Sequence, residues 1–160
     1  MKTPASISGH PVHPMLVVFP IGLWVSSLVS DLIFLFGRNF LWNSIAFYTM
    51  AGGLIGALLA AIPGLVDMFS IRDQKIGQLA WNHMVVNIVT FVAFALNLFL
   101  RLILEPDAFF PVLLSLIGVI LLAYAGWLGG ELAYVHGVGI HMPQKSPEPE
   151  SARTNWRRAG

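Results

Sequence analysis

Four long apolar runs follow one another along this chain and are separated by short polar segments. They cover residues 14–36, 41–66, 79–104 and 109–134. Each run exceeds the roughly 20 residues that an α-helix needs to cross about 30 Å of hydrocarbon. We therefore predict an all-α membrane protein in which four transmembrane helices form an up-down bundle with short loops.

The composition agrees with a chain that is mostly in contact with lipid. Hydrophobic residues make up 56% of the 160 residues and charged residues 11%, whereas soluble domains carry about 25% charged residues. The first run is too long for the apolar part of a signal peptide, about 7–15 residues, so we expect it to remain as a span. After a membrane domain of residues 1–142, residues 143–160 mix prolines with charges, which predicts a disordered tail.

Basic residues gather on one side of the predicted membrane domain. Arg38 and Arg101 fall on the other side. Because cytoplasmic loops carry an excess of Lys and Arg, this bias predicts that both termini lie in the cytoplasm. The basic residues on the side of the termini are Lys2, Arg72, Lys75, Lys145, Arg153, Arg157 and Arg158.

Small residues recur every four positions in the second run, at Gly52, Gly56, Ala60 and Gly64. Lipid tails are as apolar as leucine, so helices in a membrane associate through such close-packing faces. These faces are expected to hold the bundle together, and they would serve a homo-oligomer or another membrane subunit equally well.

All five histidines are expected at the end of the bundle that carries the termini. His10 and His13 precede the first run, His83 opens the third, and His136 and His141 follow the fourth. In an up-down bundle, the starts of helices one and three and the ends of helices two and four meet at one end. Two carboxylates, Asp67 and Glu131, belong to the same end.

Imidazole is the commonest metal ligand in proteins, and carboxylates complete many non-haem metal sites. Two histidines that face each other are also how b-type haem is held in helical membrane proteins. The candidate haem ligands are His83 with His10 or His13, and Asn87 is placed to support His83 by a hydrogen bond. The candidate set for a non-haem metal is His10, His13, Asp67, His83 and Glu131. The alternative is that these histidines are ordinary interfacial residues whose polar tips reach water.

The sequence gives little evidence for an enzymatic or nucleic-acid-binding function. Asp31 is the charged residue inside the first run, and we expect it near the far interface, facing headgroups or paired with Arg38. The absence of cysteine excludes thiol catalysis and Cys-ligated clusters. Nucleotide-binding, serine-hydrolase and zinc-protease motifs are missing, so nothing indicates an enzyme. The chain offers no basic surface for nucleic acid beyond its short tail.

Particular strings resemble a known family. GHPVHPML at residues 9–16, running into FPIGLW at 19–24, resembles the opening of the bacterial membrane family called domain of unknown function 2231, and GLVD at 64–67 and GGELAY at 129–134 agree with it. The resemblance covers residues 9–140 and implies a bacterial inner-membrane protein of undefined biochemical role. Some relatives are fused to a Rieske-type iron–sulfur domain, which implies a redox partner. Relatives often carry His in place of Glu131, and a carboxylate there suits a non-haem metal better than haem.

Three functional hypotheses remain open at this point. The chain binds a metal or haem at its histidine-bearing end for redox work, or it is a non-catalytic structural or partner-binding subunit. The third hypothesis is a pathway for a small solute or for protons, lined by Asp31 and Asn87.

Overall fold

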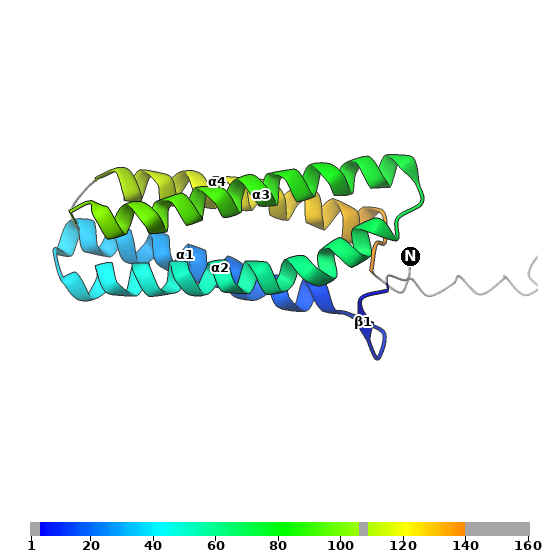
Figure 1. Cartoon of the computed structure of the whole chain (residues 1–160), viewed down its shortest axis with the longest axis horizontal. Helices are drawn as coiled ribbons and strands as arrows, with labels where there is room; N and C mark the ends of the chain where they lie inside the picture. The colour runs from blue at the N-terminus through cyan, green and yellow to red at the C-terminus, as the bar shows by residue number, and fades with distance from the viewer. Residues whose placement is uncertain (1–3, 106–108, 140–160) are drawn as a thin grey trace, which may run out of the picture.

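Four long helices, each antiparallel to the next along the chain, make up the computed structural model, which describes residues 4–105 and 109–139 (Figure 1). A short antiparallel hairpin of two strands precedes them, and the last helix continues into a π-helical segment. All four helices are long and apolar enough to cross a membrane, so the predicted all-α architecture is confirmed. The predicted tail, residues 143–160, lies outside the described residues. The elements in order are β1 (Ser6–Ile7), β2 (His10–Pro11), α1 (Val12–Gly37), α2 (Phe40–Phe69), α3 (Gln74–Ile103), α4 (Phe109–Gly130) and η1 (Glu131–Val135).

Polar caps set where two of the helices begin. Asp73 accepts hydrogen bonds from the main-chain N–H groups of Lys75 and Ile76 at 2.8 and 3.1 Å, and α3 therefore begins at Gln74, before the apolar run predicted from residue 79. Asn39 caps α2 in the same way, accepting from the N–H of Leu41 at 3.0 Å. Such caps satisfy N–H groups that have no partner within the helix.

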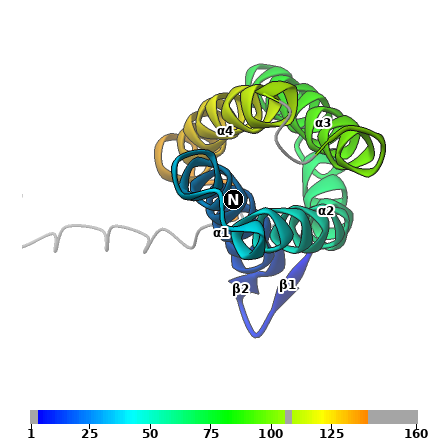
Figure 2. The same ribbon diagram turned by 90° about the vertical axis from the view of Figure 1, so that its left-hand side faces the viewer.

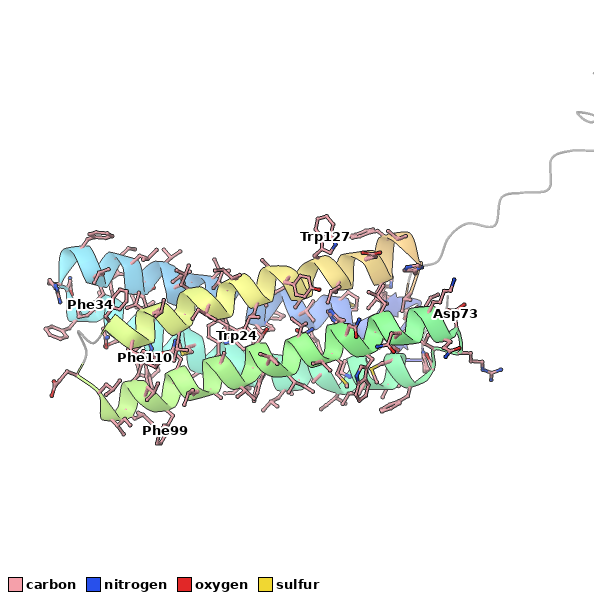
Figure 3. All side chains as sticks on the ribbon, turned by 90° about the horizontal axis from the view of Figure 1, so that it is seen from above. Trp24, Phe34, Asp73, Phe99, Phe110 and Trp127 are labelled. Carbon is pink, nitrogen blue, oxygen red and sulfur yellow. The ribbon has the colours of Figure 1, made fainter. Side chains whose placement is uncertain are left out.

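Large apolar side chains cover the outside of the bundle. Phe99 and Trp127 are 56% and 73% exposed, and Figure 3 shows both pointing away from the other helices. Soluble monomers rarely expose contiguous apolar surfaces on this scale. The exposed apolar belt is therefore the lipid-facing surface of a membrane protein.

The middle of the bundle is closed by two stacked aromatic rings. Trp24 of α1 and Phe94 of α3 lie with their ring centres 4.3 Å apart and their planes 12° from parallel, and both are buried. A Cβ atom on Gly53 would overlap the Trp24 ring, and one on Gly118 would lie 2.7 Å from the Phe94 ring. Each ring therefore fits only because the neighbouring helix carries glycine at that level.

The two helix pairs, α1 with α2 and α3 with α4, repeat the same arrangement. Trp24 and Phe94 are 70 positions apart in the first helix of each pair, and their glycines, Gly53 and Gly118, are 65 positions apart in the second. The end-on view in Figure 2 shows the four helices around a common centre. The bundle thus consists of two similar helix pairs related by an approximate twofold axis, and residues at equivalent positions of α1 and α3 meet near that axis.

The stripe of small residues in α2 packs against α1 of the same chain. Cβ atoms added at Gly52, Gly56 and Gly64 would meet Leu23, Pro20 and His13 at 3.4, 3.2 and 2.8 Å. This face holds the first helix pair together.

Candidate histidine site

His13 lies in the first turn of α1 and is held against α2. Its Nδ1 is 2.7 Å from the main-chain oxygen of Ala60. The imidazole also lies over Gly64, where an added Cβ would be 2.8 Å from Nδ1. The ring is therefore fixed by one hydrogen bond and by a close contact that only glycine permits.

His83 occupies the equivalent position of the second helix pair, 70 positions along the chain. Its Nδ1 lies 3.0 Å from the main-chain oxygen of Ala125 in α4. A Cβ on Gly129 would lie 3.0 Å from the ring. Ala125 and Gly129 stand 65 positions after Ala60 and Gly64. Both histidines are therefore held in the same way, by a hydrogen bond to an alanine carbonyl and by packing over a glycine.

The hydrogen bonds define the tautomer that each ring adopts in its neutral form. A carbonyl oxygen only accepts, so Nδ1 of both histidines carries the proton and donates it, which leaves a lone pair on Nε2. Asn87 agrees with this assignment for His83, since its Nδ2 lies 3.1 Å from His83 Nε2 and 2.8 Å from the main-chain oxygen of the same residue. Two acceptors around one amide nitrogen also determine the orientation of the Asn87 side chain.

The two imidazoles approach each other across the bundle. Their ring centres are 6.4 Å apart and their planes are almost perpendicular, at 88°. Each Nδ1 is tied to the second helix of its own pair, α2 for His13 and α4 for His83. Of the residues that the sequence singles out, the structure brings together His13, His83 and Asn87.

The remaining candidate ligands lie elsewhere. His10 is exposed in β2, and His136 is exposed after η1. Asp67 is buried and accepts a hydrogen bond at 2.9 Å from the main-chain N–H of Ala5, which ties the N-terminal segment to the end of α2. Glu131 begins η1 and is half-buried.

His141 lies outside the described residues. Within residues 4–105 and 109–139, no three His, Asp or Glu side chains are grouped so that they would hold one metal ion. The five-residue set expected for a non-haem metal is therefore not assembled in the described part of the chain.

A second polar cluster lies at the opposite end of the bundle, and its main partner was not expected from the sequence. Asp31 is buried and its Oδ2 accepts from Arg101 Nη2 at 2.5 Å and from Ser115 Oγ at 2.7 Å. Arg101 Nε also donates to Asn97 Oδ1 at 3.2 Å. The sequence suggested headgroups or Arg38 as the partner of Asp31. Helix α1 instead turns this carboxylate toward the bundle axis, where a buried charge requires an opposite charge.

Sequence comparison matches residues 9–142 to the family described as predicted membrane protein, domain of unknown function 2231 (DUF2231). The chain belongs to this family. No curated protein and no solved structure matches it significantly. In this DUF2231 protein the matched segment includes all four helices and both histidines of the pair. The resemblance identified from the opening string and the later segments is thereby confirmed.

Proposed function

We propose that this membrane protein binds a b-type haem between His13 and His83 for electron transfer. The observation that carries the proposal is the facing pair of imidazoles, each with Nδ1 on a main-chain carbonyl and its lone pair on Nε2. Metal-bound histidines usually donate their other ring N–H to a carbonyl or carboxylate in this way, which orients the ring and raises its basicity.

The spacing of the rings supports a shared metal. Metal–imidazole bonds are about 2.0–2.1 Å long, so two imidazoles on opposite sides of one ion have ring centres about 6 Å apart. The observed separation is 6.4 Å. Perpendicular ring planes are compatible with two ligands that share one axis, because each ring is free to rotate about its metal–nitrogen bond.

The number of ligands favours haem over a non-haem ion. Non-haem sites generally need three or more protein ligands, and the described residues supply two imidazoles. In haem the porphyrin supplies the other four nitrogens, so two axial histidines complete the iron. Binding at His83 Nε2 requires the Asn87 amide to turn from that nitrogen while keeping its bond to the main-chain oxygen.

The test is an absorption titration of the purified full chain with haem in mild detergent. We expect saturation at one haem per chain, with a Soret band typical of two axial imidazoles. His13→Ala and His83→Ala should each weaken binding by more than about tenfold, as losses around metal ligands commonly do. His10→Ala and His136→Ala are matched controls because both side chains are exposed and outside the pair, and they should bind like the wild type. Absence of the band, or equal binding by the variant lacking both His13 and His83, would contradict the proposal.

We further propose that the histidine end faces the cytoplasm of a bacterium, with the protein in the inner membrane. Arg72 and Lys75 flank the turn between α2 and α3 at that end. Arg101 is engaged with Asp31 inside the bundle, so it contributes little to the charge of the opposite loops, and the bias of basic residues is sharper than the sequence suggests.

The chain contains no cysteine, so single-cysteine labelling has no background. Gln74→Cys lies at the histidine end and Gly37→Cys at the other end, and both positions are exposed. In intact spheroplasts, a membrane-impermeant maleimide should label Gly37→Cys and leave Gln74→Cys unlabelled until the membrane is opened. The reverse pattern would place the histidines on the outside.

A further inference from the structure

A cavity of about 150 Å³ lies at the end of the bundle opposite the histidines. It is formed by the last turns of α1 and α3 together with the first turns of α2 and α4, which is the end where Figure 3 labels Phe34. Asp31 and Arg101 form its charged wall, and Phe34, Phe47 and Tyr48 form its aromatic wall. The polar side chains of Asn43, Ser44 and Glu105 also line it.

The charged wall is rigid and still has hydrogen-bond donors available. The side chains of Asp31 and Arg101 are 2% and 6% exposed. Arg101 uses Nε toward Asn97 and Nη2 toward Asp31 and Ser115. A guanidinium carries five N–H groups, two of them on Nη1, and Nη1 makes no hydrogen bond to any residue in the described ranges. Arg101 therefore lines the cavity with a fixed, preorganised donor.

Size and lining restrict what this cavity holds. An enclosed core cavity of about 150 Å³ is known to hold one benzene molecule, so this pocket, which is partly open to its surroundings, has room for about one six-membered ring. Phe34, Phe47 and Tyr48 supply aromatic surface against which such a ring packs. The donor of Arg101 calls for an oxygen acceptor on that ring.

Charge and position decide between a soluble anion and a lipid-soluble ligand. Asp31 and Glu105 are both among the lining residues, against the single positive charge of Arg101. This balance disfavours a free phosphate or carboxylate, whereas a neutral carbonyl accepts a hydrogen bond from arginine without adding charge. The ends of membrane-spanning helices lie at the boundary of lipid and water, which a lipid-soluble ligand can reach from within the bilayer.

We propose that this cavity binds the head ring of a lipid-soluble quinone, with one quinone carbonyl accepting a hydrogen bond from Arg101 and the ring lying against Phe34 and Phe47. The site is separate from the histidine pair, and the proposal concerns binding alone. Asp31 acts here as a positioning residue, because it holds the guanidinium in place.

The test uses the full chain purified in detergent and titrated with decylubiquinone, with the unfolding temperature as the readout of binding. We expect a saturable rise in that temperature. Val112→Phe places a large side chain in the cavity lining and should weaken binding by at least about tenfold, because the added ring occupies space that the head ring of the ligand needs. Val92→Phe adds the same bulk on the lipid-facing surface, where Val92 is 56% exposed, and should leave binding unchanged.

Arg101 belongs to the buried ion pair, so a substitution there can weaken folding as well as ligand binding. We therefore test Arg101→Lys alongside Val112→Phe, which leaves the ion pair in place. Arg101→Lys keeps the charge and loses the planar fork, and we expect weaker quinone binding by a folded protein. The proposal is overturned if the wild type shows no saturable shift, if Val112→Phe keeps it, or if mass spectrometry finds a phospholipid in the cavity that decylubiquinone does not displace. His13→Ala should leave quinone binding intact, so this test and the haem test fail independently.

Discussion

Single glycines decide whether the two histidines fit against their neighbouring helices. We expect Gly64→Ala to displace the His13 ring, because the new Cβ would lie 2.8 Å from Nδ1. Overpacking of this kind costs about 1–3 kcal/mol, and haem affinity should fall with it. Gly126→Ala is the matched control, since nothing lies within 4 Å of its Cβ position. Thermal unfolding and the haem titration measure both effects, and equal behaviour of the two variants would contradict the packing argument.

The buried ion pair between Asp31 and Arg101 is also a property of individual residues. Arg101→Met leaves the Asp31 carboxylate buried without its cation, and removing one partner of a buried pair costs about 3–5 kcal/mol. The double variant Asp31→Leu with Arg101→Met should recover much of that loss, because neither charge then remains. Unfolding in detergent checks the cycle. A double variant no more stable than Arg101→Met would show that the pair is not the source of the effect.

At the scale of elements, hydropathy predicts the membrane helices well and their polar ends poorly. The apolar runs reproduce the number and order of the helices because lipid-facing side chains must be apolar along almost the whole span. Helix α3 begins at Gln74, before the apolar run at residues 79–104, because its first turns are polar and are stabilised by the Asp73 cap.

The site was predictable only in part, because the order of the helices places a residue at one end of the bundle without specifying where its side chain points. This order brings His13, His83, Asp67 and Glu131 to one end of the bundle. The carbonyls of Ala60 and Ala125 decide which side chains meet, and main-chain acceptors leave no trace in a sequence.

The cap of α3 gives a stability that depends on pH. Hydrogen bonds from the main-chain N–H groups of Ile76 and Lys75 lower the pKa of the Asp73 carboxyl below its ordinary value of 3.8. A carboxyl whose pKa is lower in the folded state stabilises the fold above the ordinary value, and this contribution is lost as the pH falls through the folded value. Asp73→Ala should therefore lower the unfolding temperature at pH 7, and this effect should shrink as the pH falls below 3.8 and through the folded value. Asp73→Asn keeps the cap without a titrating group, so it should lose less stability at pH 7.

At the scale of the whole molecule, the chain consists of two similar helix pairs, α1 with α2 and α3 with α4. Equivalent positions carry Trp24 and Phe94, or Asp31 and Arg101, and these pairs share position without sharing residue type. A residue of α1 near the approximate axis contacts the residue at the equivalent position of α3. Where these two residues are charged and buried, opposite charges are more favourable than like charges.

This symmetry predicts that the ion pair tolerates a reversal. The double variant Asp31→Arg with Arg101→Asp should be more stable than either single variant, because it restores one positive and one negative charge near the axis. It should remain less stable than the wild type, because Ser115 and Asn97 support the present orientation and their equivalents are Met50 and Ser27. Unfolding of the four proteins in one detergent measures this. A reversed pair no better than the worse single variant would contradict the twofold relation.

The stacked rings of Trp24 and Phe94 have a consequence for the movement of protons or solutes along the bundle axis. Both side chains are at most 3% exposed, and they stand between the imidazoles at one end and the ion pair at the other. They form a closed layer across the bundle, so a proton or solute moving along the axis would have to displace two closely packed aromatic rings. The aromatic layer therefore separates the two polar ends of the bundle, and substitutions at one end should add to those at the other without interaction.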